Sequence, residues 1–192
     1  AFAGQFDQYG NLPGSSVSLF LALDNDGDED LFVGRSTLPS KLFCNNGDGT
    51  FTEVRRGSPD PALAKNPGVS RPNAAIRGEW ASVASAADFN NDGLVDLYVG
   101  RYLDPRNSLP TTLFYTRNSE GNTLLMNNGD LTFTDVTEEM GVRDGGLTLG
   151  TAWGDYDNDG DLDLYVANDF GRNAFFENQG PSGTRNAKGN PV

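Results

Sequence analysis

Three short acidic windows, repeated at nearly equal spacing, constrain this chain more than any other feature. They read ALDNDGDED at 22–30, DFNNDGLVD at 88–96 and DYDNDGDLD at 155–163. The shared pattern is D-x-[DN]-x-D-G-x-x-D, and the windows follow one another at intervals of 66 and then 67 residues. Self-similarity at a fixed interval is typical of repeat proteins. Each window is therefore expected at the same place in a repeated structural unit.

Each window places its oxygen-bearing side chains as in a loop that wraps around a hard cation. Oxygens at the first, third and fifth positions can face one ion, because the glycine at the sixth position permits a sharp turn. The seventh position can add its backbone carbonyl and the ninth its carboxylate. Calcium accepts about six to eight oxygen ligands at irregular angles, whereas magnesium requires a stricter octahedron. The pattern therefore predicts calcium-binding loops.

The predicted ligands follow from these positions. They are Asp24, Asp26, Asp28 and Asp30 in the first window, Asp88, Asn90, Asp92, Leu94 and Asp96 in the second, and Asp155, Asp157, Asp159, Asp161 and Asp163 in the third. Ala22 occupies the first ligand position of the first window, so we expect two to three Ca²⁺ ions with the first site weakest. The chain has no histidine and one cysteine, Cys44, so transition metals are not expected.

Two other interpretations of the windows are weaker. Acidic turns without any ion would contain the same residue types, but three windows in phase favour a shared ligand. An EF-hand needs a glutamate at the twelfth position and a helix after it. Here that position, counted from the start of each window, is valine in all three repeats (Val33, Val99 and Val166). It lies within an apolar, aromatic and β-branched run typical of a buried strand. We therefore expect calcium loops inside β-hairpins.

A second shared pattern indicates a further hairpin after each window. The segment LFCNNGDGTFTEV at 42–54 matches LLMNNGDLTFTDV at 124–136, with apolar runs on both sides of a turn rich in Asn and Gly. With one strand before each window, the sequence predicts an all-β chain of about three four-stranded antiparallel units. Their expected bounds are 16–56, 80–137 and 147–180, the last unit incomplete, with connections at 57–79 and 138–146.

These motifs resemble the FG-GAP/VCBS-type repeats, which occur in integrin α-chain propellers, in cartilage acidic protein-like proteins and in many secreted bacterial proteins. The resemblance covers about residues 16–180. It implies calcium-stabilised β-propeller blades in an extracellular scaffold for binding or adhesion. Carried over by motif position, the implied ligands are Asp24, Asp26, Asp30, Asp88, Asn90, Asp92, Asp96, Asp155, Asp157, Asp159 and Asp163. Because propellers close with about four to eight blades, we expect part of a larger propeller or assembly.

Composition excludes several classes of function. The net charge of −13 argues against nucleic acid as a partner. The longest strongly apolar run, Leu19 to Leu23, is too short to cross a bilayer. Without histidine there is no Ser-His-Asp or Cys-His catalysis, so we expect no enzyme. Cys44 is expected to be a small buried residue rather than a reactive thiol.

The partner and the location follow only from the resemblance. We expect an unidentified protein or glycan ligand, or other chains that complete the propeller, in an extracellular, cell-surface or periplasmic setting. Because the sequence begins at Ala1 without Met or an apolar leader, any export signal is expected to have been removed or not included. A carbohydrate-binding propeller is the alternative, and part of a polysaccharide lyase or hydrolase is a weaker one. Trp80 and Trp153 could stack on sugars, but their apolar surroundings favour core packing.

Overall fold

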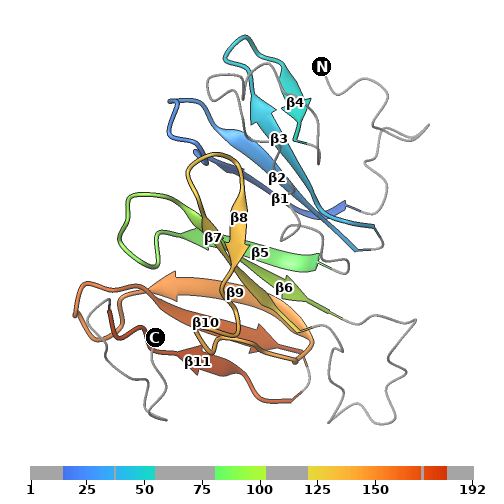
Figure 1. Ribbon diagram of the computed structural model, residues 1–192. Coiled ribbons are helices and arrows are strands. Elements are labelled where there is room, and N and C mark those ends of the chain that lie inside the picture. The colour runs from blue at the N-terminus through green and yellow to red at the C-terminus, as the bar shows by residue number, and fades with distance from the viewer. Residues whose placement is uncertain (1–14, 37, 55–80, 103–120, 170, 181–192) are drawn as a thin grey trace.

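The computed structural model describes residues 15–36, 38–54, 81–102, 121–169 and 171–180. All regular structure in these residues is β-strand, arranged as three antiparallel sheets (Figure 1). This confirms the predicted all-β fold class and its blade-like units. Within the described part of the chain, no helix is long and apolar enough to cross a membrane. The connection expected at 57–79 and the residue Trp80 lie outside the described residues.

The strands of each sheet follow one another in chain order. The first sheet contains β1 (Ser15–Leu21), β2 (Asp30–Arg35), β3 (Lys41–Asn45) and β4 (Phe51–Glu53). The second contains β5 (Ala81–Ala87), β6 (Asp96–Arg101), β7 (Thr123–Asn127) and β8 (Phe133–Asp135). The third contains β9 (Thr148–Gly154), β10 (Asp163–Asn168) and β11 (Ala174–Phe176), and no fourth strand is present among its described residues.

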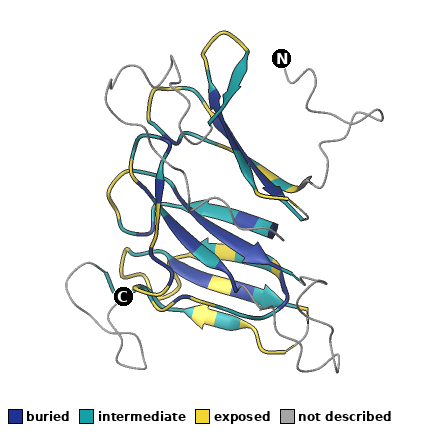
Figure 2. Cartoon of the chain, turned by 45° about the vertical axis from the view of Figure 1, so that its right-hand side comes forward, coloured by how far each residue is buried: buried dark blue, intermediate teal, exposed yellow. Residues whose placement is uncertain are grey.

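The three sheets, called blades 1, 2 and 3 below, are stacked in a row, and their first strands β1, β5 and β9 lie side by side (Figure 1). Strand β6 shows why the run Leu97-Tyr98-Val99 has no polar residue. Leu97 and Val99 face blade 1, whereas Tyr98 between them faces blade 3, and all three are buried. Because successive side chains of a strand point to opposite faces, a strand packed on both faces needs no polar alternation. Figure 2 shows the resulting buried band through the middle blade.

Serine hydroxyl groups connect neighbouring blades at one end of the first strands. Ser16 Oγ donates to the carbonyl oxygen of Ala81, and Ser82 Oγ donates to that of Thr148 at 2.7 Å. The two serines are equivalent in the repeat, so the same bond occurs at both interfaces. The equivalent residue in blade 3 is Leu149, which is exposed.

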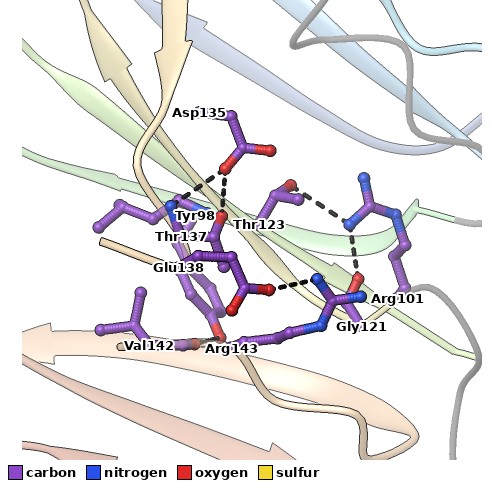
Figure 3. Close-up of polar contacts among 10 residues, drawn as sticks. Tyr98, Arg101, Gly121, Thr123, Asp135, Thr137, Glu138, Val142 and Arg143 are labelled. Atoms are coloured by element: carbon purple, nitrogen blue, oxygen red, sulfur yellow. Dashed lines mark hydrogen bonds and ion pairs between the residues drawn. The ribbon is translucent and has the colours of Figure 1, made fainter. Parts of the chain in front are cut away.

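The chain between blades 2 and 3 is fixed to blade 2 (Figure 3). The hydroxyl group of Tyr98 donates to the carbonyl oxygen of Val142 at 2.9 Å, and Thr137 donates to Asp135 through both its hydroxyl group and its N–H. Val142 is buried in the same cluster as Tyr98. Trp153 packs against Tyr98 edge-on, with ring centroids 6.4 Å apart. Trp153 is partly buried against this cluster, which agrees with the packing role expected for this tryptophan.

Candidate metal centre

The three acidic windows form the turns between the first and second strands of the blades, and they share one backbone shape. Their fourth residues are all asparagines with positive φ, at 57° for Asn25, 58° for Asn91 and 62° for Asn158. The glycine two residues later also has positive φ, for example 85° at Gly93. Asparagine and glycine adopt this left-handed conformation at the lowest cost. The windows therefore fold as the Asn and Gly spacing dictates.

The carboxylate at the first position folds its loop back on itself. In the second loop, Asp88 accepts the N–H of Asp92 at 3.0 Å and that of Gly93 at 2.8 Å. In the third loop, Asp155 makes the equivalent two bonds, both at 3.1 Å. Ala22 has no side chain that could do this in the first loop. The weakness expected of the first site thus has a second cause besides the missing ligand.

In the third loop, the candidate ligands converge. One carboxylate oxygen from each of Asp155, Asp157 and Asp159 lies within 4.8 Å of the others, and all three residues are exposed. Oxygens on opposite sides of a calcium ion are about 4.6–5.2 Å apart, since each Ca–O bond is about 2.3–2.6 Å. This donor set therefore fits calcium. The cost of desolvation and the neighbouring charge of Asp159 raise the pKa of Asp157.

The second loop has the same arrangement with one amide in place of a carboxylate. Asp88 and the side-chain oxygen of Asn90 both accept the N–H of Asp92, at 3.0 and 3.1 Å. The amide nitrogen of Asn90 donates to Asp92 at 2.9 Å. These side chains therefore lie together at the mouth of the turn.

The first loop offers a poorer donor set. Its close group consists of Asp24, Asp30 and Cys44, whose ligand atoms lie within 4.8 Å of one another. Cys44 is buried, as expected, but its position beside the loop was not predicted. Sulfur is a poor ligand for calcium, which prefers oxygen. Burial raises the pKa of Asp24, with a further contribution from the charge of Asp26.

The seventh-position residues, Asp28, Leu94 and Asp161, are bonded to the fifth-position carboxylates. Their N–H groups donate at 3.0, 2.8 and 2.9 Å respectively. The side chain of Asp161 accepts the side-chain amide of Asn91 at 2.7 Å, so it contacts the second loop. In each loop, then, the fifth carboxylate supports the turn at the residue whose carbonyl was predicted as a ligand.

The ninth-position carboxylates, predicted as ligands, are buried and also hold the loop to the sheet. Asp96 accepts the N–H of Phe89 at 3.3 Å and that of Asn127, at the end of β7, at 2.7 Å. Asp30 and Asp163 make the equivalent pairs of bonds in their own blades. Burial raises the pKa of Asp96 to about 7 and that of Asp30 to about 6, against the bonds from the N–H groups, which lower it.

Sequence reasoning missed one set of functional residues, the asparagines that end the third strands or follow them. These are Asn45, Asn127 and Asn178. Asn45 and Asn127 begin the N-N-G pattern that indicated a turn, and Asn178 begins the sequence N-Q-G at the same place in the third repeat. Each donates its backbone N–H to the buried carboxylate of its blade. The asparagines were therefore visible in the sequence, but a turn alone accounted for them, and no bond to the buried carboxylate was predicted.

A family model described as an FG-GAP-like repeat matches residues 23–99 and 112–166, which contain nearly all of the three loops and more than half of the chain. The chain belongs to the FG-GAP-like repeat family. This confirms the resemblance stated from the motifs. Neither that description nor the names of the relatives below denotes an enzyme.

The chain is also similar to cartilage acidic protein 1 of two organisms. It is 30 % identical over 145 residues to cartilage acidic protein 1 of Xenopus tropicalis, which is 75 % of this chain and 18 % of the relative. It is 29 % identical over 140 residues to cartilage acidic protein 1 of Homo sapiens, which is 72 % of this chain and 17 % of the relative. The chain thus spans less than a fifth of the length of these relatives.

Proposed function

We propose that this chain is a calcium-binding part of an extracellular β-propeller that acts as an interaction scaffold. The observation that carries the proposal is the convergence of exposed oxygens from Asp155, Asp157 and Asp159 in a loop that recurs at the same place in every blade. Calcium would neutralise each loop and fix the hairpin that continues into the buried second strand. Its role is structural, and the blades it stiffens present surfaces to a protein or glycan partner.

Electrostatics supports this proposal. Thirteen of the 27 acidic residues lie in the three windows, and the net charge is −13. Three calcium ions would bring the net charge to −7, which reduces the self-repulsion of the compact state. Calcium modules outside the cell typically bind at about 10⁻⁴–10⁻³ M. The names of both relatives refer to cartilage, which agrees with an extracellular setting.

The outer face of blade 3 supports the propeller part of the proposal. Tyr165 is 42 % exposed there, whereas its equivalents Phe32 and Tyr98 are completely buried between blades. Phe175 is 47 % exposed and its equivalent Leu124 is buried. We infer that this face packs against a further blade of the same kind, because both interfaces inside the chain bury these same positions.

Calorimetric titration with CaCl₂, together with thermal unfolding in calcium and in EDTA, tests calcium binding. We expect binding at millimolar calcium or below and a lower melting temperature in EDTA. Asp159→Asn should remove the heat of one site. Glu139→Gln removes the same charge from an exposed residue outside the loops and should change nothing. A melting curve that EDTA leaves unchanged would contradict the proposal.

Sedimentation equilibrium tests the outer face. Copies of this chain should self-associate, and the double variant Tyr165→Ser, Phe175→Ser should remain monomeric. Leu38→Ser, which removes an exposed apolar side chain from blade 1, is the matched control. A monomeric wild-type chain, or equal association of all three proteins, would contradict the assignment of this face.

A further inference from the structure

The loops formed by the three acidic windows are joined across the blade interfaces by a continuous path of hydrogen bonds. Within blade 2, the path runs from Phe89 through the buried carboxylate of Asp96 to the backbone N–H of Asn127. The side chain of Asn127 then crosses to blade 1, where its amide nitrogen donates to the carbonyl oxygen of Leu23 at 2.9 Å. Leu23 is the second residue of the first loop, and its own N–H is bonded to Asp30.

The same crossing occurs at the second interface. The side-chain amide of Asn178 in blade 3 donates to the carbonyl oxygen of Phe89 at 2.7 Å. Phe89 is the second residue of the second loop, so its position matches that of Leu23. Each asparagine therefore contacts the buried carboxylate of its own loop with its backbone and the neighbouring loop with its side chain.

A second pair of contacts joins the exposed parts of the loops directly. The side-chain amide of Asn25 donates to the carbonyl oxygen of Gly93 at 3.3 Å, and that of Asn91 donates to Asp161 at 2.7 Å. Both asparagines hold the fourth position of their loop, and both partners lie at the sixth or seventh position of the next loop. The order of one loop is thus connected to the order of the next by two independent routes.

We propose that Asn127 and Asn178 are positioning residues that couple neighbouring metal loops, so that an ion in one loop raises the affinity of the next. The inference rests on the proposed function, since it assumes that the loops bind calcium. An ion held by the second loop fixes Asp96, and Asn127 then holds Leu23 and the first loop in its bound shape. The incomplete first loop depends most on this coupling, because Ala22 cannot organise it from within.

Burial explains why the coupling is strong enough to measure. Asn127 is only 2 % exposed, and its side chain also donates to the carbonyl oxygen of Val95 and accepts the N–H of Gly129. Hydrogen bonds in such a buried site are costly to lose, so the arrangement resists partial opening. Coupling between sites is typically about 5- to 150-fold in affinity.

Blade 1 supplies a matched control. Asn45 holds the same position as Asn127, donates its N–H to Asp30 and accepts the N–H of Gly47. Its side-chain amide donates to the carbonyl oxygen of Glu29 in its own blade, and no contact with another blade is found among the described residues. Asn45→Ala and Asn127→Ala therefore remove comparable bonds within a blade, but only Asn127→Ala removes the crossing.

The test is a calcium titration of the ¹⁵N-labelled chain by NMR, with the amide of Leu23 reporting on the first loop and that of Phe89 on the second. Asp92→Asn impairs the second loop in the wild-type, Asn45→Ala and Asn127→Ala backgrounds. We expect Asp92→Asn to weaken calcium binding at the first loop at least about fivefold in the first two backgrounds. In the Asn127→Ala background, the same change should have a clearly smaller effect, because among the described residues only the exposed contact between Asn25 and Gly93 still joins the two loops.

The possible results of this titration distinguish failure of the coupling from failure of calcium binding. Equal effects of Asp92→Asn in all three backgrounds, or no effect in the wild type, would overturn the coupling while leaving calcium binding intact. Absence of calcium shifts at both loops would overturn the proposed function itself. Should Asn127→Ala not fold, hydrogen exchange at Leu23 in calcium-loaded wild type and Asp92→Asn still decides it. Coupling predicts faster exchange in the variant, and unchanged exchange would refute it.

Discussion

Restoring the missing carboxylate of the first loop by Ala22→Asp is the sharpest test of how these loops work. Asp88 and Asp155, at the equivalent positions, each accept two backbone N–H groups and lie beside the other candidate ligands. Ala22 is half-buried directly after β1, and the equivalent N–H groups, those of Asp26 and Gly27, follow four and five residues later. The substitution should therefore add both a ligand and two loop bonds to the first site.

The size of the effect follows from these bonds. A hydrogen bond to a charged group contributes about 1.5–3 kcal/mol. Without calcium, repulsion by Asp24 and Asp26 offsets this gain, since like charges about 4 Å apart cost roughly 1–4 kcal/mol near a surface. Calcium removes that repulsion. We therefore expect little change in the stability of the metal-free chain and an affinity of the first loop raised about ten- to one-hundred-fold.

Isothermal titration calorimetry measures this affinity, and EDTA-treated protein gives the metal-free stability. The control is Glu29→Asp, which keeps the charge at an exposed position of the same loop that is not a predicted ligand. If Ala22→Asp binds calcium no more tightly than the wild type, the role assigned to the first position is wrong.

Two further predictions concern buried groups. Burial raises the pKa of Asp96 from 3.8 to about 7, so this group favours the metal-free fold at low pH, and its contribution is lost as pH rises through 7. In urea unfolding with EDTA, the free energy of unfolding should therefore fall between pH 4 and pH 8, by up to roughly 4 kcal/mol from this group. This contribution should be absent in Asp96→Asn. An equal dependence of the free energy of unfolding on pH in both proteins would argue against it. Tyr98→Phe should cost about 1–3 kcal/mol, because it leaves the buried carbonyl oxygen of Val142 without its donor. Tyr165→Phe, at the exposed equivalent, should cost less than about 0.5 kcal/mol in the same denaturation experiment, and similar losses for both would contradict the assigned burial.

Local patterns were enough to predict the fold class and the loops. The spacing of Asp and Gly fixes the turn, and the run Leu97-Tyr98-Val99 after it is apolar at every position, which indicates a strand buried on both faces. The N-N-G pattern likewise placed the second hairpin. These signals lie within a few residues of one another, so they can be recognised without tertiary information.

Contacts between distant residues could not be predicted in this way. Asn127 and Leu23 are 104 residues apart, and nothing in either segment indicates that one side chain reaches the other loop. The buried position of Asp96 was also hidden, because a carboxylate in a calcium motif is expected to face the ion rather than two backbone N–H groups. Cys44 was expected in the core, but its position near Asp24 and Asp30 depends on how blade 1 folds back on its loop.

A crystal structure of the chain grown in calcium, with anomalous scattering used to identify the ions, tests the central claim most directly. We expect an ion in the second and third loops, with oxygens of Asp155, Asp157 and Asp159 at about 2.3–2.6 Å from the ion in the third. Loops that hold no ion at saturating calcium, or ions bound elsewhere on the blades, would contradict it.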